Sequence, residues 1–172
     1  MIDLDNPDWL FVGQGSYGEV YRLAGTNLAI KVIMDVGKNK FDLAVIEFLR
    51  GFAVRKSKYA PKFYGVLPVT YKNPDFVASR NPKKHYVYAT DGHVSEKYRQ
   101  TYGILIEYVG NKTNAVIKYS RFKYVLHKAN KDFAKYGYEI FDPNIDNFRV
   151  IRNKKGGISK FWYVDMGGIR KI

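Results

Sequence analysis

The sequence contains no cysteine, and its first residues lack the character of a secretory signal. Without cysteine there are neither disulfide bonds nor thiolate ligands for a metal, so the chain can exist in a reducing cytosol. Residues 1–7 carry two acidic side chains and no basic one, whereas a signal peptide begins with basic residues. These absences favour a cytoplasmic location.

Long apolar runs are also absent, and acidic residues are scarce. No run approaches the roughly 18 apolar residues of a membrane-spanning helix, so we expect no transmembrane segment. Asp and Glu total 16 against 29 for Lys and Arg, a formal net charge of +13. This excess attracts nucleotide phosphates, nucleic acid, an anionic membrane surface or an acidic protein, without choosing among them. A solvated basic face with no specific ligand also stays open.

The composition is that of a globular chain. With 172 residues, 46% hydrophobic and 16% aromatic, the chain can bury a core as one domain or as two small lobes that share an interface. Neither disorder nor an internal repeat is indicated.

Residues 9–23 are predicted to form two strands joined by a glycine-rich turn. Gly13, Gly15 and Gly18 let the backbone bend tightly and bring N–H groups close to an anion. A dinucleotide-binding turn would need a helix directly after the glycines. Because the sequence continues as a strand, a hairpin over phosphates fits better.

Residues 28–34 are predicted as the next strand, followed by a helix over 39–53. Lys31 is the only charge in the apolar strand, so its ammonium group either extends to solvent or meets a buried anion. An apolar stripe at helical spacing is predicted to face the core, formed by Phe41, Ala44, Val45, Phe48, Leu49 and Phe52. Glu47 falls on the flank of this stripe, where it is either an exposed surface residue or a half-buried partner for a cation.

The middle of the chain is predicted to contain a long insertion between two strands. Strands are predicted at 62–71 and 103–110, and residues 72–102 between them exceed the usual connection. A short strand near 86–90 within the insertion is expected, and the insertion is a candidate partner-binding element. His85 and His93 lie here without a second pair of ligands at metal spacing, so we interpret them as surface residues.

The C-terminal part is predicted as a helix over 118–136 ended by Gly137, then a strand at 148–152, a turn at 154–157 and a strand at 158–164. Asp142, Asn147 and Asp165 lie where two strand ends and a loop can converge. Their oxygens suit a magnesium ion and a proton-acceptor role, although Asp and Asn are also ordinary turn residues.

The order of these elements resembles the protein kinase family over nearly the whole chain. The matching segments are 12–20 for the glycine-rich loop, 29–31 for the lysine strand, Glu47 for the helix glutamate, 104–109 for the adenine-binding strand and hinge, Asp142 with Asn147 for the catalytic loop, and 165–167 for the metal-binding motif. The resemblance implies an α+β, bilobal, protein kinase-like fold in one domain. An antiparallel-sheet N-lobe would cover 1–109, including the insertion 72–102, and a strongly reduced helical C-lobe would cover 110–172.

The resemblance also implies the roles of individual residues. Asp142 would orient or deprotonate the substrate hydroxyl, and Lys31 would contact the phosphates of ATP while held by Glu47. Asn147 and Asp165 would hold Mg²⁺. The remaining nucleotide-binding residues would be Gly13, Gly15, Gly18, Val20, Ala29, Glu107 and Val109, with Ile106 as gatekeeper.

Several positions depart from the family pattern. Ile140 and Phe141 replace the His-Arg pair before the catalytic Asp, Asn144 replaces a lysine, and Arg149 stands where an apolar adenine floor is usual. The activation segment and the helical half that follow the metal-binding motif in this family are not expected here. The sequence thus resembles the minimal kinases of bacterial secreted effectors or phages, which would act in a host cytosol.

We therefore predict an ATP- and Mg²⁺-dependent protein kinase, acting on Ser or Thr of a protein substrate, for which an acidic protein would suit the net charge. Four alternatives stay open: a pseudokinase that binds nucleotide or a partner, a small-molecule kinase, an adenylyltransferase, and a basic nucleic-acid binder. The oligomeric state and the identity of the substrate are not indicated.

Overall fold

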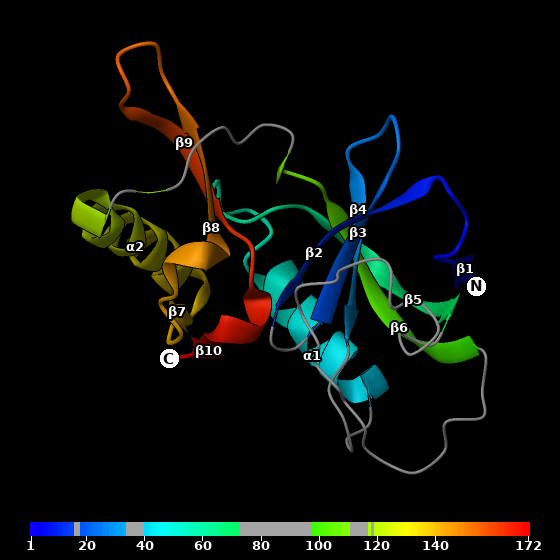
Figure 1. The fold of residues 1–172 in the computed structure, drawn as a ribbon. Coiled ribbons are helices and arrows are strands. Elements are labelled where there is room, and N and C mark those ends of the chain that lie inside the picture. The colour runs from blue at the N-terminus through cyan, green and yellow to red at the C-terminus, as the bar shows by residue number, and fades with distance from the viewer. Residues whose placement is uncertain (16–17, 34–39, 73–97, 111–116, 118) are drawn as a thin grey trace.

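A computed structural model describes residues 1–15, 18–33, 40–72, 98–110, 117 and 119–172 (Figure 1). In chain order the elements are β1 Ile2–Asp3, β2 Trp9–Gly15, β3 Gly18–Leu23, β4 Leu28–Ile33, α1 Lys40–Ala53, β5 Phe63–Lys72, β6 Tyr98–Glu107, α2 Tyr119–Phe133, η3 Ala134–Tyr136, β7 Tyr138–Ile140, η4 Ile145–Asn147, β8 Phe148–Arg152, β9 Ile158–Tyr163, η5 Met166–Gly168 and β10 Ile169–Lys171. The chain is a mixed α+β structure with a curled, mainly antiparallel sheet and two α-helices.

The largest sheet has six strands in the order β1-β5-β6-β4-β3-β2. All its pairs are antiparallel except β1 with β5. The chain turns from β3 to β4 at Gly25, whose φ of 71° is a backbone conformation that favours glycine. β4 lies at the centre of the sheet between β3 and β6, so Lys31 is carried by a strand whose neighbours fix its position.

The predicted insertion was too long. β5 extends to Lys72 and β6 begins at Tyr98, so residues 98–102 belong to a paired strand instead of a connection. Residues 73–97, with the short strand predicted near 86–90 and both His85 and His93, lie outside the described residues. The prediction began β6 too late because Arg99 and Gln100 interrupt the apolar pattern. In the structure this part of β6 is held by hydrogen-bonded pairing with β5, which continues along both ten-residue strands.

α1 is rotated relative to the prediction. The helix forms where expected, but its buried positions are Ala44, Glu47 and Gly51. Phe41, Leu49 and Phe52 are exposed, contrary to the predicted stripe. The reason is steric, because a Cβ at Gly51 would lie 2.5 Å from the Phe63 ring of β5. Small residues on the inner face let α1 approach the sheet closely, and Glu47 is carried inward with them.

The C-terminal elements pack around a separate core. α2 contributes Val125, Ala129 and Phe133 to this core, and β8 with β9 contributes Phe148, Val150, Phe161 and Tyr163. The predicted Gly137 helix end is confirmed by its φ of 78°. β7 and β10 pair with each other, a pairing absent from the sequence prediction because both strands have only three residues.

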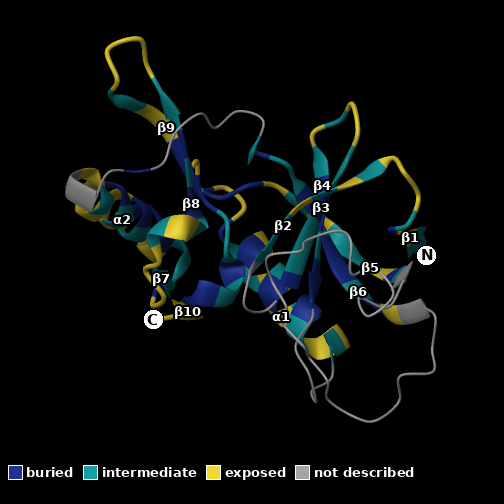
Figure 2. Cartoon of the chain, viewed as in Figure 1, coloured by how far each residue is buried: buried dark blue, intermediate teal, exposed yellow. Residues whose placement is uncertain are grey.

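α1 lies between the six-stranded sheet and the C-terminal elements, as Figure 1 shows. The buried residues in Figure 2 follow the inner strands, the inner side of α1 and the side of α2 that faces β8. Val54 and Ala60, which lie between α1 and β5, belong to the C-terminal core. Within the described part of the chain, no helix combines the length and the hydropathy needed to cross a membrane.

Candidate functional site

Lys31 meets two carboxylates from distant segments of the chain. Its Nζ lies 2.6 Å from Glu47 Oε1 and 2.9 Å from Asp165 Oδ1. The side chains are 16%, 10% and 24% exposed, so the three charges are largely removed from water. The alternative in which Lys31 extends to solvent is therefore wrong, and so is the alternative in which Glu47 is an exposed surface residue.

The two carboxylates set the protonation state of Lys31. Burial by itself lowers the pKa of an ammonium group, because the charged form loses its hydration. The negative charges and hydrogen bonds of Glu47 and Asp165 outweigh this effect, and the pKa of Lys31 is raised. The Lys31 side chain is thus protonated at neutral pH, and its ammonium group contacts Asp165.

Asp165 is shared between Lys31 and Asn147. Asp165 Oδ2 accepts a hydrogen bond from Asn147 Nδ2 at 3.3 Å, while Oδ1 faces Lys31. The backbone supports this contact, since Val164 N donates to Asn147 O at 2.8 Å. Asn147 and Asp165, which were predicted to converge, are therefore adjacent. Asn147 lies just before β8, and Asp165 lies just after β9.

Backbone hydrogen bonds fix the position of the loop that carries Asp142. The amides of Phe141 and Asp142 both donate to Gly168 O, at 3.0 and 3.2 Å. Tyr163 Oη donates to Asp142 O at 3.0 Å. The Asp142 side chain is exposed, and no side chain within the described residues forms a hydrogen bond with its carboxylate. Its carboxylate is thus accessible on a backbone that is fixed.

Tyr163 is a neutral donor in this arrangement. Burial raises the pKa of its phenol, and the nearby Asp165 carboxylate raises it further. Because Tyr163 is buried in the C-terminal core, it links that core to the loop that carries Asp142.

Gly168 leaves the space that this arrangement needs. A Cβ there would lie 2.2 Å from Tyr163 Oη, 3.2 Å from Asp142 Cβ and 3.4 Å from Asp165 Oδ2. Any side chain at this position must therefore displace the hydroxyl that supports Asp142. Two glycines follow Met166, and the first, Gly167, belongs to the motif recognised in the sequence.

The glycine-rich hairpin is formed by β2 and β3, as predicted. Gly15 pairs with Gly18 at its tip, and residues 16–17 lie outside the described residues. A Cβ at Gly18 would lie 2.2 Å from Val32 O, so packing against β4 already requires glycine there. A Cβ at Gly13 meets nothing within 4 Å. Gly13 therefore has no steric need for glycine in the described structure.

The other predicted nucleotide-binding residues lie along β4 and the end of β6. Ala29 is fully buried and is paired with Ile106, and Val20 packs against the same cluster while paired with Lys31. Glu107 pairs with Leu28 and also receives a hydrogen bond from Lys62 N. Val109 is buried beyond the strand. Glu107 thus lies three residue pairs from Lys31 along β4, or roughly 10 Å.

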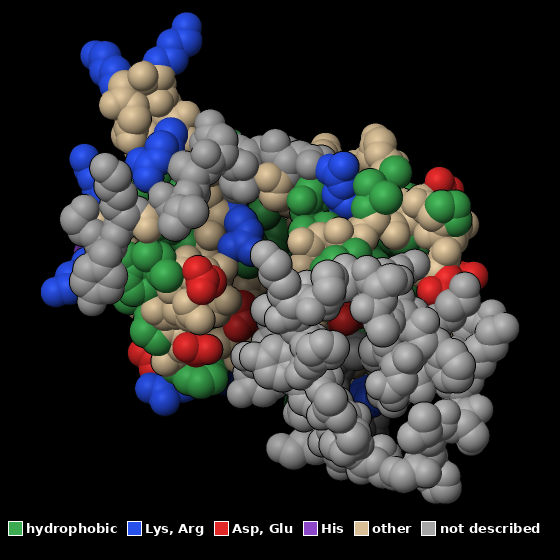
Figure 3. All heavy atoms as spheres, viewed as in Figure 1, with side chains coloured by type: hydrophobic (Ala, Val, Ile, Leu, Met, Phe, Trp, Pro, Cys, Tyr) green, Lys and Arg blue, Asp and Glu red, His purple; other side chains and the backbone are tan. Residues whose placement is uncertain are grey.

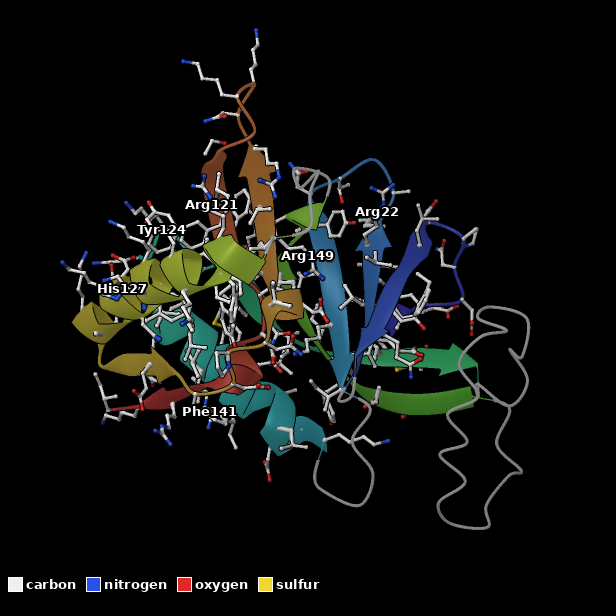
Figure 4. All side chains as sticks on the ribbon, turned by 60° about the vertical axis from the view of Figure 1, so that its left-hand side comes forward. Arg22, Arg121, Tyr124, His127, Phe141 and Arg149 are labelled. Carbon is white, nitrogen blue, oxygen red and sulfur yellow. The ribbon has the colours of Figure 1, made fainter. Side chains whose placement is uncertain are left out.

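The residues that depart from the family pattern have local roles. Asn144 caps η4, because its side chain accepts a hydrogen bond from Asp146 N. The Arg149 guanidinium donates to Phe148 O at 3.1 Å and also to Asp146 O. β8 pairs Arg149 with Trp162 on the face opposite Phe148 and Val150. Figure 4 shows Arg149 extending from β8 toward the six-stranded sheet.

The donor set suits Mg²⁺ better than a transition metal. No cluster of three or more His, Cys, Asp or Glu side chains with metal-binding geometry occurs among the described residues. Asp165 and Asn147 nevertheless lie side by side, joined by the hydrogen bond from Asn147 Nδ2 to Asp165 Oδ2, and Mg²⁺ is commonly held by the oxygens of one or two such side chains together with substrate phosphates and water.

Two residues of this region were missed in the sequence. Arg50 Nη1 donates to Gly167 O at 2.9 Å, and Tyr163 holds the Asp142 loop. Arg50 had a detectable signal, because it lies three positions after Glu47 and thus on the same side of α1. Tyr163 had none beyond its place in an apolar strand.

Comparison with protein-family models gives no match, and comparison with curated proteins gives none.

Proposed function

We propose that this chain is a minimal, bilobal, protein kinase-like phosphotransferase that moves the γ-phosphate of ATP to a Ser or Thr hydroxyl of a protein, with Mg²⁺ as cofactor. The observation that carries the proposal is the double contact of Lys31 with Glu47 and Asp165. These residues come from β4, α1 and the segment after β9. A buried, paired cation that is also adjacent to an Asn–Asp pair is what phosphoryl transfer requires, and core packing alone does not require it.

The nucleotide would lie along β4 beneath the glycine-rich hairpin. Val20 and Ala29 would contact the base, and the backbone near Glu107 and Val109 would bond to its edge. The separation of roughly 10 Å between the levels of Glu107 and Lys31 suits a nucleotide whose base lies at one end and whose phosphates lie at the other. Gly13, Gly15 and Gly18 would let the hairpin backbone approach the phosphates.

Asn147 and Asp165 would hold the metal, which supplies neutralisation of phosphate charge when bound. In this state the Asp165 carboxylate would be shared between the metal and the Lys31 ammonium group. Glu47 keeps Lys31 in place from the opposite side, because its carboxylate bonds to the same nitrogen.

Asp142 would act on the acceptor hydroxyl. Its carboxylate orients the hydroxyl and accepts its proton as the oxygen forms a bond to the γ-phosphorus. The bond between the γ-phosphorus and the β,γ-bridging oxygen breaks, and its electron pair leaves on ADP. Asn144 caps η4 and so does not supply the cation usual two residues after this Asp. Lys31, which contacts Asp165, is then the cation of the described site that would neutralise phosphate charge.

A basic surface on the C-terminal part would receive the protein substrate. α2 has a single acidic residue, Asp132, and its buried carboxylate is bonded to Ser57 and Lys135. The outer face of α2 carries Arg121, Lys123, Tyr124, His127, Lys128 and Lys131. Figure 4 shows Arg121, Tyr124 and His127 along this helix, and Figure 3 shows further Lys and Arg side chains at the tip of the β8–β9 hairpin. An acidic segment of a cytosolic protein fits this face.

The proposal is tested by incubating the protein with Mg²⁺ and γ-labelled ATP in a cytosolic lysate. Wild type is compared with Lys31→Met, Asp165→Ala and the surface variant Lys56→Met, which removes an exposed charge after α1. Label on a protein Ser or Thr that depends on Lys31 and Asp165, and not on Lys56, supports the proposal. Nucleotide binding without any transfer would overturn it in favour of a pseudokinase.

A parallel incubation with α-labelled ATP separates two further outcomes. Protein label from the α-phosphate would show adenylyl transfer, and label confined to small molecules would show a small-molecule kinase. Either result would overturn the protein-kinase assignment. Salt-sensitive binding of RNA or DNA that survives Lys31→Met, without transfer, would instead identify a nucleic-acid binder.

A further inference from the structure

Arg50 connects α1 directly to the segment that carries Asp165. Its Nη1 lies 2.9 Å from Gly167 O, although the two residues are 117 positions apart. Arg50 lies three residues after Glu47, about 4.5 Å further along the helix axis. α1 is therefore attached to the Asp165 segment twice, through Glu47 and Lys31 and through Arg50 itself.

Gly167 is close enough to the charged cluster for this second contact to matter. A Cβ at Gly167 would lie 3.2 Å from Asp165 Oδ1 and 3.7 Å from Glu47 Oε2. The following residue, Gly168, accepts the amides of Phe141 and Asp142 and donates to Asp165 O. A displacement of Gly167 would thus reach both carboxylates that hold Lys31 and the loop that carries Asp142.

Arginine suits this contact for two reasons. Its guanidinium stays charged at all relevant pH values, and a bond from a charged donor to a carbonyl is stronger than one between neutral groups. Arg50 also lies in the last turn of α1, where a cation interacts favourably with the helix dipole. The contact therefore holds both the helix end and the Gly167 carbonyl.

We propose that Arg50 is a positioning residue that keeps Lys31, Glu47 and Asp165 assembled before nucleotide binds. The use of that assembly in phosphoryl transfer rests on the proposed function, whereas the attachment of α1 to the Asp165 segment does not. In the absence of Arg50, binding energy from the nucleotide must bring the three groups together. The fraction of competent molecules falls, and the apparent nucleotide affinity falls in the same proportion.

The test compares Arg50→Met with Arg55→Met, which removes the same charge just beyond α1. Arg55 is exposed, bonds to Phe52 O and lies over the Phe52 ring, whereas the bond to Gly167 O comes from Arg50. We expect Arg50→Met to raise the KM for MgATP, and the Kd of MgATP, about tenfold, the lower end expected for losing a charge-assisted bond. At saturating MgATP kcat stays near that of wild type. A general loss of folded protein would instead lower kcat and leave KM unchanged.

A second measurement is independent of activity. Amide hydrogen exchange, followed by mass spectrometry without nucleotide, should become about tenfold faster in residues 141–142 and 165–168 of Arg50→Met and unchanged there in Arg55→Met. Arg50→Lys keeps a cationic donor, so its exchange rates and its MgATP affinity should lie between those of wild type and Arg50→Met. This variant keeps the test available if Arg50→Met folds poorly.

Unchanged MgATP affinity together with unchanged exchange in Arg50→Met would overturn the inference. A wild-type protein that binds no nucleotide would overturn the proposed function instead, and the exchange measurement would still decide whether Arg50 holds the Asp165 segment.

Discussion

The ammonium group of Lys31 lies 2.6 Å from the carboxylate of Glu47, and this contact joins the central strand of the sheet to the inner face of α1. Glu47 is 7% exposed, so a carboxylate lies in the interface where α1 packs on the sheet. Such a group is tolerated only while a cation and hydrogen bonds compensate its lost hydration. The site and the packing of α1 are therefore linked.

Replacing Lys31 by Met should strongly destabilise the protein. The Glu47 and Asp165 carboxylates would remain close together without their shared cation. Breaking a buried ion pair by removing one partner costs roughly 3–5 kcal/mol. Urea denaturation of Lys31→Met would measure this loss against Lys154→Met, which removes an exposed charge in the β8–β9 turn. Equal stability of the two variants would contradict the role assigned to the contact.

Stability should fall at alkaline pH because Lys31 and Tyr163 both have raised pKa values. Their ordinary pKa values are 10.5 and 10.0. Below these values folded and unfolded chains hold the same protons, and the stabilisation is fully present. Above them the unfolded chain loses protons that the folded chain retains, so the free energy of unfolding decreases as pH rises.

The slope from each of these groups approaches about 1.4 kcal/mol per pH unit. Urea denaturation between pH 9 and pH 12, a range of roughly three units around these ordinary values, should show a shallower decline in Lys31→Met and in Tyr163→Phe than in wild type. Parallel declines in all three proteins would show that other groups cause the alkaline loss.

Asp142→Asn should strongly reduce transfer without affecting folding. The Asp142 carboxylate is exposed and the loop is held by backbone bonds, so the amide leaves the loop in place. Removal of a general base typically costs 10²–10⁴-fold in rate, and we expect a loss of about 100-fold or more in kcat. Asp146→Asn, an exposed carboxylate in η4, is the matched control. A kcat reduced equally in both variants would remove Asp142 from the catalytic role.

Gly168→Ala should displace the Asp142 loop through Tyr163. The new Cβ would lie 2.2 Å from Tyr163 Oη, so the hydroxyl must move away from Asp142 O. We expect a loss of roughly 1–3 kcal/mol in stability, as for other overpacking changes, together with reduced transfer. Gly65→Ala introduces the same methyl group where nothing lies within 4 Å.

The double variant Gly168→Ala with Tyr163→Phe tests the cause. Removing the hydroxyl eliminates the closest contact, so the Gly168→Ala change should cost less stability in the Tyr163→Phe background than in wild type. An unchanged cost would place the strain elsewhere in the 165–168 segment.

Ser57→Ala should weaken the attachment of the segment after α1 to α2. Ser57 Oγ donates to Asp132 Oδ2 at 2.6 Å, and Asp132 is 8% exposed. Loss of this donor leaves a buried carboxylate oxygen with one fewer bond, which costs roughly 1–3 kcal/mol. Thermal unfolding at pH 7 compared with Ser159→Ala, an exposed serine in β9, would measure the difference.

The same contact can be measured through its pH dependence. Burial opposes ionisation of Asp132, but hydrogen bonds from Lys135 and Ser57 outweigh it and its pKa is lowered from 3.8. A lowered pKa gives stability that is present above 3.8 and is lost as pH falls through the folded-state value. Asp132→Asn should therefore show a smaller loss of stability between pH 4 and pH 2, a range of about two units below the ordinary value, than wild type.

The local structure was largely predictable because its signals are local. Alternating apolar residues and glycine turns predicted β2 to β4 and the β8–β9 hairpin, and helical spacing predicted α1 and α2 within a few residues. Lys31, Asn147 and Asp165 were selected by residue type and order, and the structure brings these three together with Glu47.

Only the tertiary structure decided which side of α1 faces inward and what holds the site together. The rotation of α1 depends on the fit of Gly51 against Phe63, and the Arg50 contact depends on where the chain returns after 117 residues. The three-residue strands β7 and β10 exist because they pair with each other. Sequence periodicity reports the preferences of neighbouring residues, whereas these features arise from steric fit and hydrogen bonds between segments that meet only in the folded chain.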